Sequence, residues 1–139
     1  MINSRRSSFA VAALLTITFF SIGLVHGQTS WFKLDIPFAF YMGDTLLPAG
    51  RYQLENLTGN AMRVFAVQGR QSATVATFAV NRTAEKPGSK LIFNRYGKDY
   101  FLTEMWGIDH AEGRKLLPSP VERELAKKIT PTRLTLAGK

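Results

Sequence analysis

Apolar and polar side chains alternate strictly over residues 32–41 of the chain. The apolar positions of this run are Phe32, Leu34, Ile36, Phe38 and Phe40. Because successive side chains of a strand point to opposite faces, a period of two predicts a strand with one buried face. Pro37 has no N–H for a sheet ladder, so this strand is expected at a sheet edge or with a bulge.

Three further segments are expected to be strands, because they are short and bounded by turn residues. They are residues 51–57, 61–68 and 72–80, the last two being rich in Val, Thr and Phe. In the first of them, Tyr52 and Leu54 share one side. Residues 42–50 are expected to be a connection that ends in a type I turn, with Pro48 at the second position and Gly50 at the fourth.

Residues 91–107 contain a hairpin signal with five aromatic residues. Gly97-Lys98 suits a two-residue turn with Gly first, which pairs Phe93 with Leu102, Arg95 with Tyr100, and Leu91 with Glu104. One face then carries Leu91, Phe93, Tyr100, Leu102 and Trp106, and the other carries Ile92, Tyr96, Phe101 and Met105 with Asn94 and Thr103. Since both faces are substantially apolar, the first is predicted to be core and the second to lie under another element. A three-residue turn would exchange the two sets.

The predicted covering element is a helix over residues 119–129. Ser119 can cap it, Pro120 suits its first position, and Glu122 completes a capping box. An apolar stripe recurs every four residues, at Val121, Leu125 and Ile129. The helix is expected to stop before Thr130-Pro131. Residues 132–136 suit a last short strand within the tail, residues 130–139.

These elements predict an all-β fold with one C-terminal helix. At least six short strands, with adjacent ones joined by short turns, favour an antiparallel meander curled into a small barrel or sandwich. The pattern does not choose between the two. A single domain over residues 28–139 fits this length.

The N-terminus reads as a secretory signal peptide over residues 1–27. A basic start with Arg5 and Arg6 precedes an apolar run of about 17 residues and a short polar exit. The small residues Val25 and Gly27 place cleavage between Gly27 and Gln28. The alternative is an uncleaved anchor, for which the run is at the lower length limit. Cleavage predicts a secreted or periplasmic bacterial protein with no remaining membrane span.

Composition narrows the chemistry of the exported chain. The sequence has no Cys, which excludes disulfides, a Cys-linked lipid anchor, thiolate catalysis and Cys metal sites. Loss of Arg5 and Arg6 with the signal leaves 16 basic residues against 10 acidic ones, a net charge of +6. These charges are scattered with mixed signs, which favours a solvated basic surface over a dedicated anion site.

Three blocks of the chain, taken in order, carry a resemblance. They are IPFAFYMGDTLLPAGRYQL (36–54), KLIFNRYGKDYFLTEMWG (90–107) and GRKLLPSPVERELAKK (113–128). In this order they resemble a family of short, uncharacterised secreted bacterial proteins. That family has a Pro-Phe strand, an LPAGxY turn, a YGxxYFL hairpin and a closing ERELA helix. The resemblance implies a shared exported β domain and no catalytic residue.

Candidate chemistry centres on His110, the single histidine left after cleavage. With Asp109 and Glu112 it offers a hard-metal site or an acid–base pair, but neighbours at this spacing in a loop do not converge on one point, and polar residues between Gly107 and Gly113 favour a solvated turn. No Ser lies in a Gly-x-Ser-x-Gly elbow, and no phosphate-binding Gly loop or His-Glu-x-x-His is present. We therefore expect no enzyme and assign no catalytic residue, metal ligand or cofactor.

Two functions remain open. Nucleic acid is not an expected partner. Aromatic residues near Lys90, Arg95 and Lys98 resemble those of sheets that stack bases, but residues 96–101 do not fit the RNP1 pattern.

The first of the two functions is a non-enzymatic envelope or extracellular interaction domain, which binds an unknown protein, glycan or surface partner through a strand edge or exposed aromatic patch. The second is a small carrier, with an apolar ligand inside the barrel or between sheet and helix. Its candidate lining is Phe38, Phe40, Phe93, Leu102 and Trp106.

Overall fold

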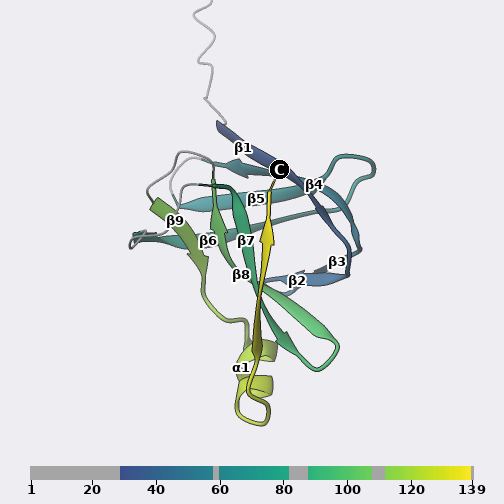
Figure 1. Ribbon diagram of the computed structural model, residues 1–139, viewed down its shortest axis with the longest axis vertical. Coiled ribbons are helices and arrows are strands. Elements are labelled where there is room, and N and C mark those ends of the chain that lie inside the picture. Colours follow the sequence, from purple (N-terminus) through teal and green to yellow (C-terminus); the bar gives the residue numbers. More distant parts are fainter. Residues whose placement is uncertain (1–28, 58–59, 82–87, 108–111, 139) are drawn as a thin grey trace, which may run out of the picture.

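The computed structural model describes residues 29–57, 60–81, 88–107 and 112–138 (Figure 1). The expected signal peptide lies outside these residues. The described part holds ten strands and one helix: β1 (Thr29–Ile36), β2 (Phe40–Met42), β3 (Thr45–Leu47), β4 (Gly50–Asn56), β5 (Ala61–Ala66), β6 (Ser72–Asn81), β7 (Lys90–Tyr96), β8 (Asp99–Trp106), β9 (Glu112–Leu116), α1 (Pro120–Ala126) and β10 (Thr132–Ala137). The expected class, all-β with one C-terminal helix, is confirmed.

The strands form one mixed sheet that is not closed into a barrel, so the fold is sandwich-like. The main path runs β1-β4-β5-β6-β9-β8-β2-β3, and β7 and β10 extend the sheet from β8. All pairings are antiparallel except that of β2 with β8, where Tyr41 lies opposite Phe101. The order departs from a simple meander because β9, and not β7, lies beside β6.

Strand β6 belongs to both parts of this sheet. Its first half, from Ser72 to Ala76, pairs with β5. Its second half, from Thr77 to Asn81, pairs with β9. The sheet is therefore continuous from the β1-β4-β5 part to the β9-β8-β7-β10 part. The core lies between the two parts.

The alternating run near the N-terminus keeps its buried face but is not one strand. Phe32, Leu34 and Ile36 are buried in β1, and Phe40 is buried in β2. The ladder breaks at Pro37, which has no N–H to donate. As expected for a strand next to Pro37, β1 lies at an edge of the sheet.

The expected connection over residues 42–50 is itself a hairpin. Phe40 pairs with Leu47 and Met42 with Thr45, and the turn places Gly43 at φ +60°, where glycine is favoured. Both strands have only three residues, too few for an alternating pattern to reveal them.

The β7–β8 hairpin follows the predicted register near its turn and then shifts by one residue. Gly97 has φ +61°, Arg95 pairs with Tyr100, and Phe93 pairs with Leu102. A bulge at Thr103 then places Leu91 opposite Met105 and Ile92 opposite Glu104. The prediction that Leu91 faces Glu104 was therefore wrong, because a bulge leaves one residue unpaired and exchanges the faces beyond it. Met105 joins the core in place of Trp106.

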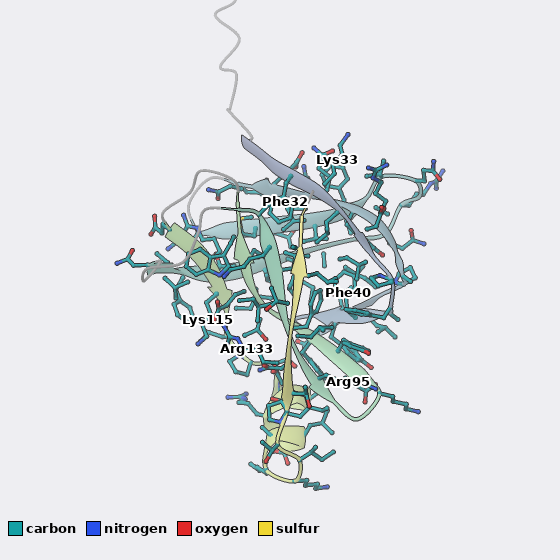
Figure 2. All side chains as sticks on the ribbon, in the orientation of Figure 1. Phe32, Lys33, Phe40, Arg95, Lys115 and Arg133 are labelled. Carbon is teal, nitrogen blue, oxygen red and sulfur yellow. The ribbon has the colours of Figure 1, made fainter. Side chains whose placement is uncertain are left out.

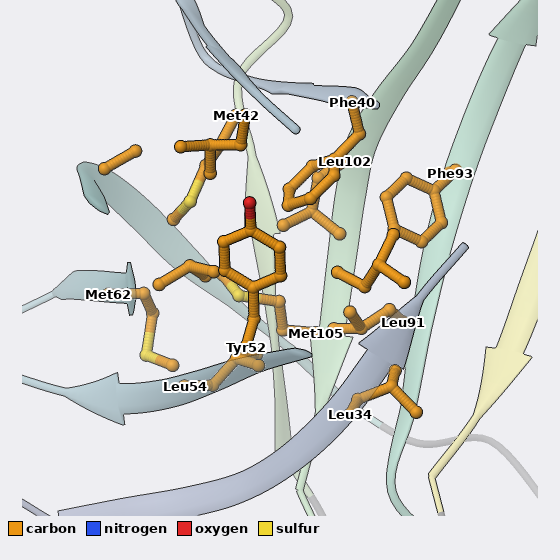
Figure 3. Packing of buried hydrophobic residues seen from close by; sticks show 14 of the residues in the cluster. Leu34, Phe40, Met42, Tyr52, Leu54, Met62, Leu91, Phe93, Leu102 and Met105 are labelled. Carbon is orange, nitrogen blue, oxygen red and sulfur yellow. The ribbon is translucent and has the colours of Figure 1, made fainter. Parts of the chain in front are cut away.

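The core is a single cluster of aliphatic, aromatic and methionine side chains from both parts of the sheet (Figure 3). Its largest fully buried members include Tyr52, Phe40, Phe93, Met62 and Met105. The Tyr52 hydroxyl donates a hydrogen bond to the carbonyl of Pro48 at 2.5 Å. This contact ties the LPAGxY turn to the core, and burial raises the pKa of Tyr52.

Candidate interaction surface

Four of the five residues predicted to line a ligand cavity come together in the core. Phe93 meets Phe38 and Phe40 edge to face, with ring centroids 5.1 and 5.7 Å apart. Leu102 is opposite Phe93 in the ladder. The fifth, Trp106, lies beyond the Thr103 bulge and on the other face of the sheet. The structure thus groups the first four as packed core, and the carrier function stays a prediction.

The other side of the β7–β8 hairpin, here called the outer face, carries Ile92, Asn94, Tyr96, Phe101, Glu104 and Trp106. Two carboxylates are buried against it. The first is Glu104, which is only 8% exposed. It accepts hydrogen bonds from the Trp106 indole N–H at 3.0 Å and from an Arg133 guanidinium nitrogen at 3.1 Å. Arg133 stands opposite Asn94 in the β10–β7 ladder, so this ion pair fastens β10 to β8 across β7.

The second buried carboxylate is Glu122 of α1, which is 5% exposed. One of its oxygens, Oε1, lies 3.2 Å from the Tyr96 hydroxyl and 3.3 Å from Nδ2 of Asn94, both of which donate to it. Burial raises the pKa of Tyr96, and the charge of Glu122 raises it further. These contacts hold α1 on the end of β7 that leads into the Gly97 turn.

The helix therefore turns a different side toward the sheet than its apolar pattern indicates. It touches the outer face at Asn94 and Tyr96, at one end of β7, and Ser119 caps it by accepting the Glu122 N–H at 3.2 Å. It ends at Ala126, however, and its buried residue is Glu122. The predicted stripe is turned outward: Val121 is 53% exposed and Ile129 43%, while Leu125 is half-buried. The expectation that this stripe packs on the hairpin was wrong, because the polar groups of Tyr96 and Asn94 select a hydrogen-bonding partner.

Residues 117–129 form what we call the C-terminal arm, and it carries a concentration of exposed apolar side chains. Six large apolar residues of the described chain are exposed, and three of them lie in the arm: Leu117, Val121 and Ile129. Leu117 is the most exposed of the six, at 71%. Buried polar groups and exposed apolar groups are the informative departures from ordinary burial, and the arm shows both.

Cations accompany these apolar side chains. Arg123, Lys127 and Lys128 are exposed on the arm, and Lys127 pairs with Glu124 at 2.9 Å on the surface. In Figure 1 the arm forms one tip of the molecule, next to the β7–β8 turn. Figure 2 shows Arg95 reaching outward from that hairpin, and Lys98 is exposed in its turn.

Two surface hollows lie elsewhere, around the loop between β5 and β6. One, of about 260 Å³, is lined by Arg63, Arg70, Gln71 and their neighbours. The other, of about 410 Å³, lies between this loop and the LPAGxY turn. Arg63 already binds the buried Glu55 carboxylate and stacks over Phe65, with its guanidinium carbon 5.6 Å from the ring centroid. The arginine of the first hollow is thus already engaged in contacts within its own part of the sheet.

The structure describes only one of the three candidate metal or acid–base residues. Asp109 and His110 lie outside the described residues, and Glu112 begins β9 as an exposed side chain. Within the described ranges, no three potential ligand side chains gather into a metal site. Nor does any helix in those ranges combine the length and the apolar character needed to cross a bilayer.

Comparison with protein-family models finds no match, and comparisons with curated proteins and with solved structures find none either. The resemblance to a family of secreted β domains therefore stays a prediction. The C-terminal arm is the candidate interaction surface on the geometry alone.

Proposed function

We propose that the chain is an exported, non-enzymatic interaction domain of the bacterial envelope or exterior, and that it meets its partner through the C-terminal arm. Export follows from the signal sequence, with cleavage between Gly27 and Gln28. A partner follows from the surface that the domain presents once it has folded.

One observation carries the proposal, namely the inverted docking of α1. A helix that merely closed the sheet would gain most by burying Val121 and Ile129, because apolar burial stabilises by about 25 cal/mol per Å². Here the helix buries Glu122 and leaves Val121 and Ile129 53% and 43% exposed. Three exposed apolar residues in a stretch of thirteen suit an arm that a partner covers.

The packing of the core agrees with this function. Phe93 contacts the rings of both Phe38 and Phe40, and Leu102 joins the same buried cluster. An internal ligand would need these side chains to be free to contact it. Their mutual contacts favour recognition at the surface.

Site-specific photo-crosslinking in intact bacteria tests the proposal. A photoreactive phenylalanine analogue replaces Val121 in the full-length chain, and the matched control replaces Val67, which is 40% exposed at the end of β5. Adducts at position 121 and few at position 67 are expected. Equal labelling at the two positions, or adducts at neither, would count against an interaction role for the arm.

A further inference from the structure

We propose that the C-terminal arm binds an anionic lipid surface, with its apolar side chains at the headgroup boundary and its cations against the headgroups. This inference rests on the proposed function and names the partner of the same surface. Its grounds are the kinds of side chain exposed, their placement at one tip, and the small area that they offer.

The apolar side chains of the arm are accessible to solvent. Leu117 precedes the helix, Val121 lies in its first turn, and Ile129 follows its end, with exposures of 71, 53 and 43%. The Ile129 N–H donates to the Leu125 carbonyl at 2.9 Å, so the chain still follows the helical path there. Side chains of this kind on a tip can enter the boundary between headgroups and acyl chains, as interfacial helices do.

The charge around these side chains is positive. Arg123, Lys127 and Lys128 belong to the arm, whose carboxylates are the exposed Glu124 and the buried Glu122. An exposed pair such as that of Lys127 with Glu124 contributes little to stability, so Lys127 remains able to turn to another anion. Each Lys or Arg near an anionic membrane strengthens binding about fivefold.

The β7–β8 turn adds two cations to the same tip. Arg95 and Lys98 are exposed, and Nε of Arg95 donates to the Gly97 carbonyl at 2.7 Å. Because the Tyr96 hydroxyl bonds to Glu122, this turn and α1 are held together. The cations of the turn and the apolar side chains of the arm are therefore held at the same tip of the molecule.

The size of the surface favours a membrane over a protein. A stable protein–protein interface takes about 20–30 residues from each partner. The arm offers three exposed apolar residues on a short segment, and a bilayer can accept such a segment without a complementary groove. Surface binding of this kind needs apolar insertion and basic charge together, and the arm supplies both.

Vesicle co-sedimentation with the exported protein tests the proposal. Vesicles of phosphatidylcholine alone are compared with vesicles that contain one third phosphatidylglycerol. The wild-type protein should sediment with the anionic vesicles at least tenfold more strongly than with the neutral ones, and less strongly at high salt because exposed charges are screened.

Matched variants separate the arm from the general basic charge. Val121→Ser with Ile129→Ser should weaken binding to anionic vesicles at least tenfold, whereas the control Val67→Ser with Leu46→Ser removes two other exposed apolar residues and should stay within twofold. All four positions are exposed, and circular dichroism verifies that each variant is folded. Equal binding to both kinds of vesicle, equal losses in the two double variants, or no binding would each overturn the lipid assignment.

The two proposals fail in distinguishable ways. Crosslinks from position 121 to a protein, together with absent vesicle binding, would leave the interaction function standing and remove the lipid partner. Absent vesicle binding together with absent crosslinks would remove both. Crosslinks from position 121 to lipid would support both at once.

Discussion

Phe93 provides the sharpest test of how the fold is held together. Its side chain is fully buried on the core face of β7, between Phe38 and Phe40 and opposite Leu102. Truncation to alanine removes the ring and leaves its neighbours facing a cavity. We expect Phe93→Ala to destabilise the fold strongly.

The magnitude follows from two contributions. Removal of a buried phenylalanine costs about 3–5 kcal/mol in transfer and cavity terms. Edge-to-face pairs are worth roughly 0.5–1.5 kcal/mol each beyond their buried area, and Phe93 makes two of them. The loss should therefore lie in the upper half of that range. A domain of this size has a total stability of roughly 5–15 kcal/mol, so this loss is a large fraction of it.

Urea unfolding followed by circular dichroism measures this loss. Phe93→Leu keeps an apolar side chain and gives a milder step if the alanine variant is too unstable. Phe78→Ala is the control, because Phe78 is 40% exposed and loses less buried area, so it should lower the free energy of unfolding by less than Phe93→Ala does. A loss below about 1 kcal/mol for Phe93→Ala, or a loss equal to that of the control, would refute the placement of Phe93 in the core.

Three further outcomes are expected. A Cβ at Gly113 would lie 2.6 Å from ring atoms of Trp106, so Gly113→Ala should destabilise by roughly 1–3 kcal/mol in thermal or urea unfolding. Gly88→Ala meets no atom within 4 Å, and a comparable loss there would contradict the steric reasoning. The folded-state pKa of Tyr96 lies above its ordinary value of 10.0, so the free energy of unfolding should fall as pH rises above about 10, and Tyr96→Phe should make that fall shallower; an unchanged slope would speak against the shift. N-terminal sequencing of the exported protein should begin at Gln28, and a start at Met1 would show that the apolar run is kept as an anchor.

Patterns that depend on local geometry were readable in the sequence. The alternation from Phe32 to Phe40 identified the buried positions of β1 and β2, because a strand exposes its period directly. Gly97 identified the β7–β8 turn, because few other residues adopt its positive φ.

Features that depend on distant partners were not readable. The bulge at Thr103 changes which side of the sheet Trp106 and Glu104 face. No residue near Thr103 predicts a bulge from its type alone. The stripe of Val121 and Ile129 looked like a buried face, since periodicity shows that apolar residues share a side but not where that side points. Only Tyr96 and Asn94, more than twenty residues earlier, decide that Glu122 turns inward. A tyrosine at the end of a hairpin and an acid early in the following helix are the sequence features that would have predicted the inward orientation of Glu122.

The double membership of β6 has a consequence for how the domain opens. A sandwich whose two sheets share no strand can lose one sheet while the other persists. Here the ladder of Ser72 to Ala76 and that of Thr77 to Asn81 are consecutive stretches of one backbone, so strain in either is passed directly to the next residue. Cooperative units show themselves as groups of amide protons that exchange together. The amides of β5, β6 and β9 should therefore exchange with solvent as one group, and the domain should unfold as a single unit.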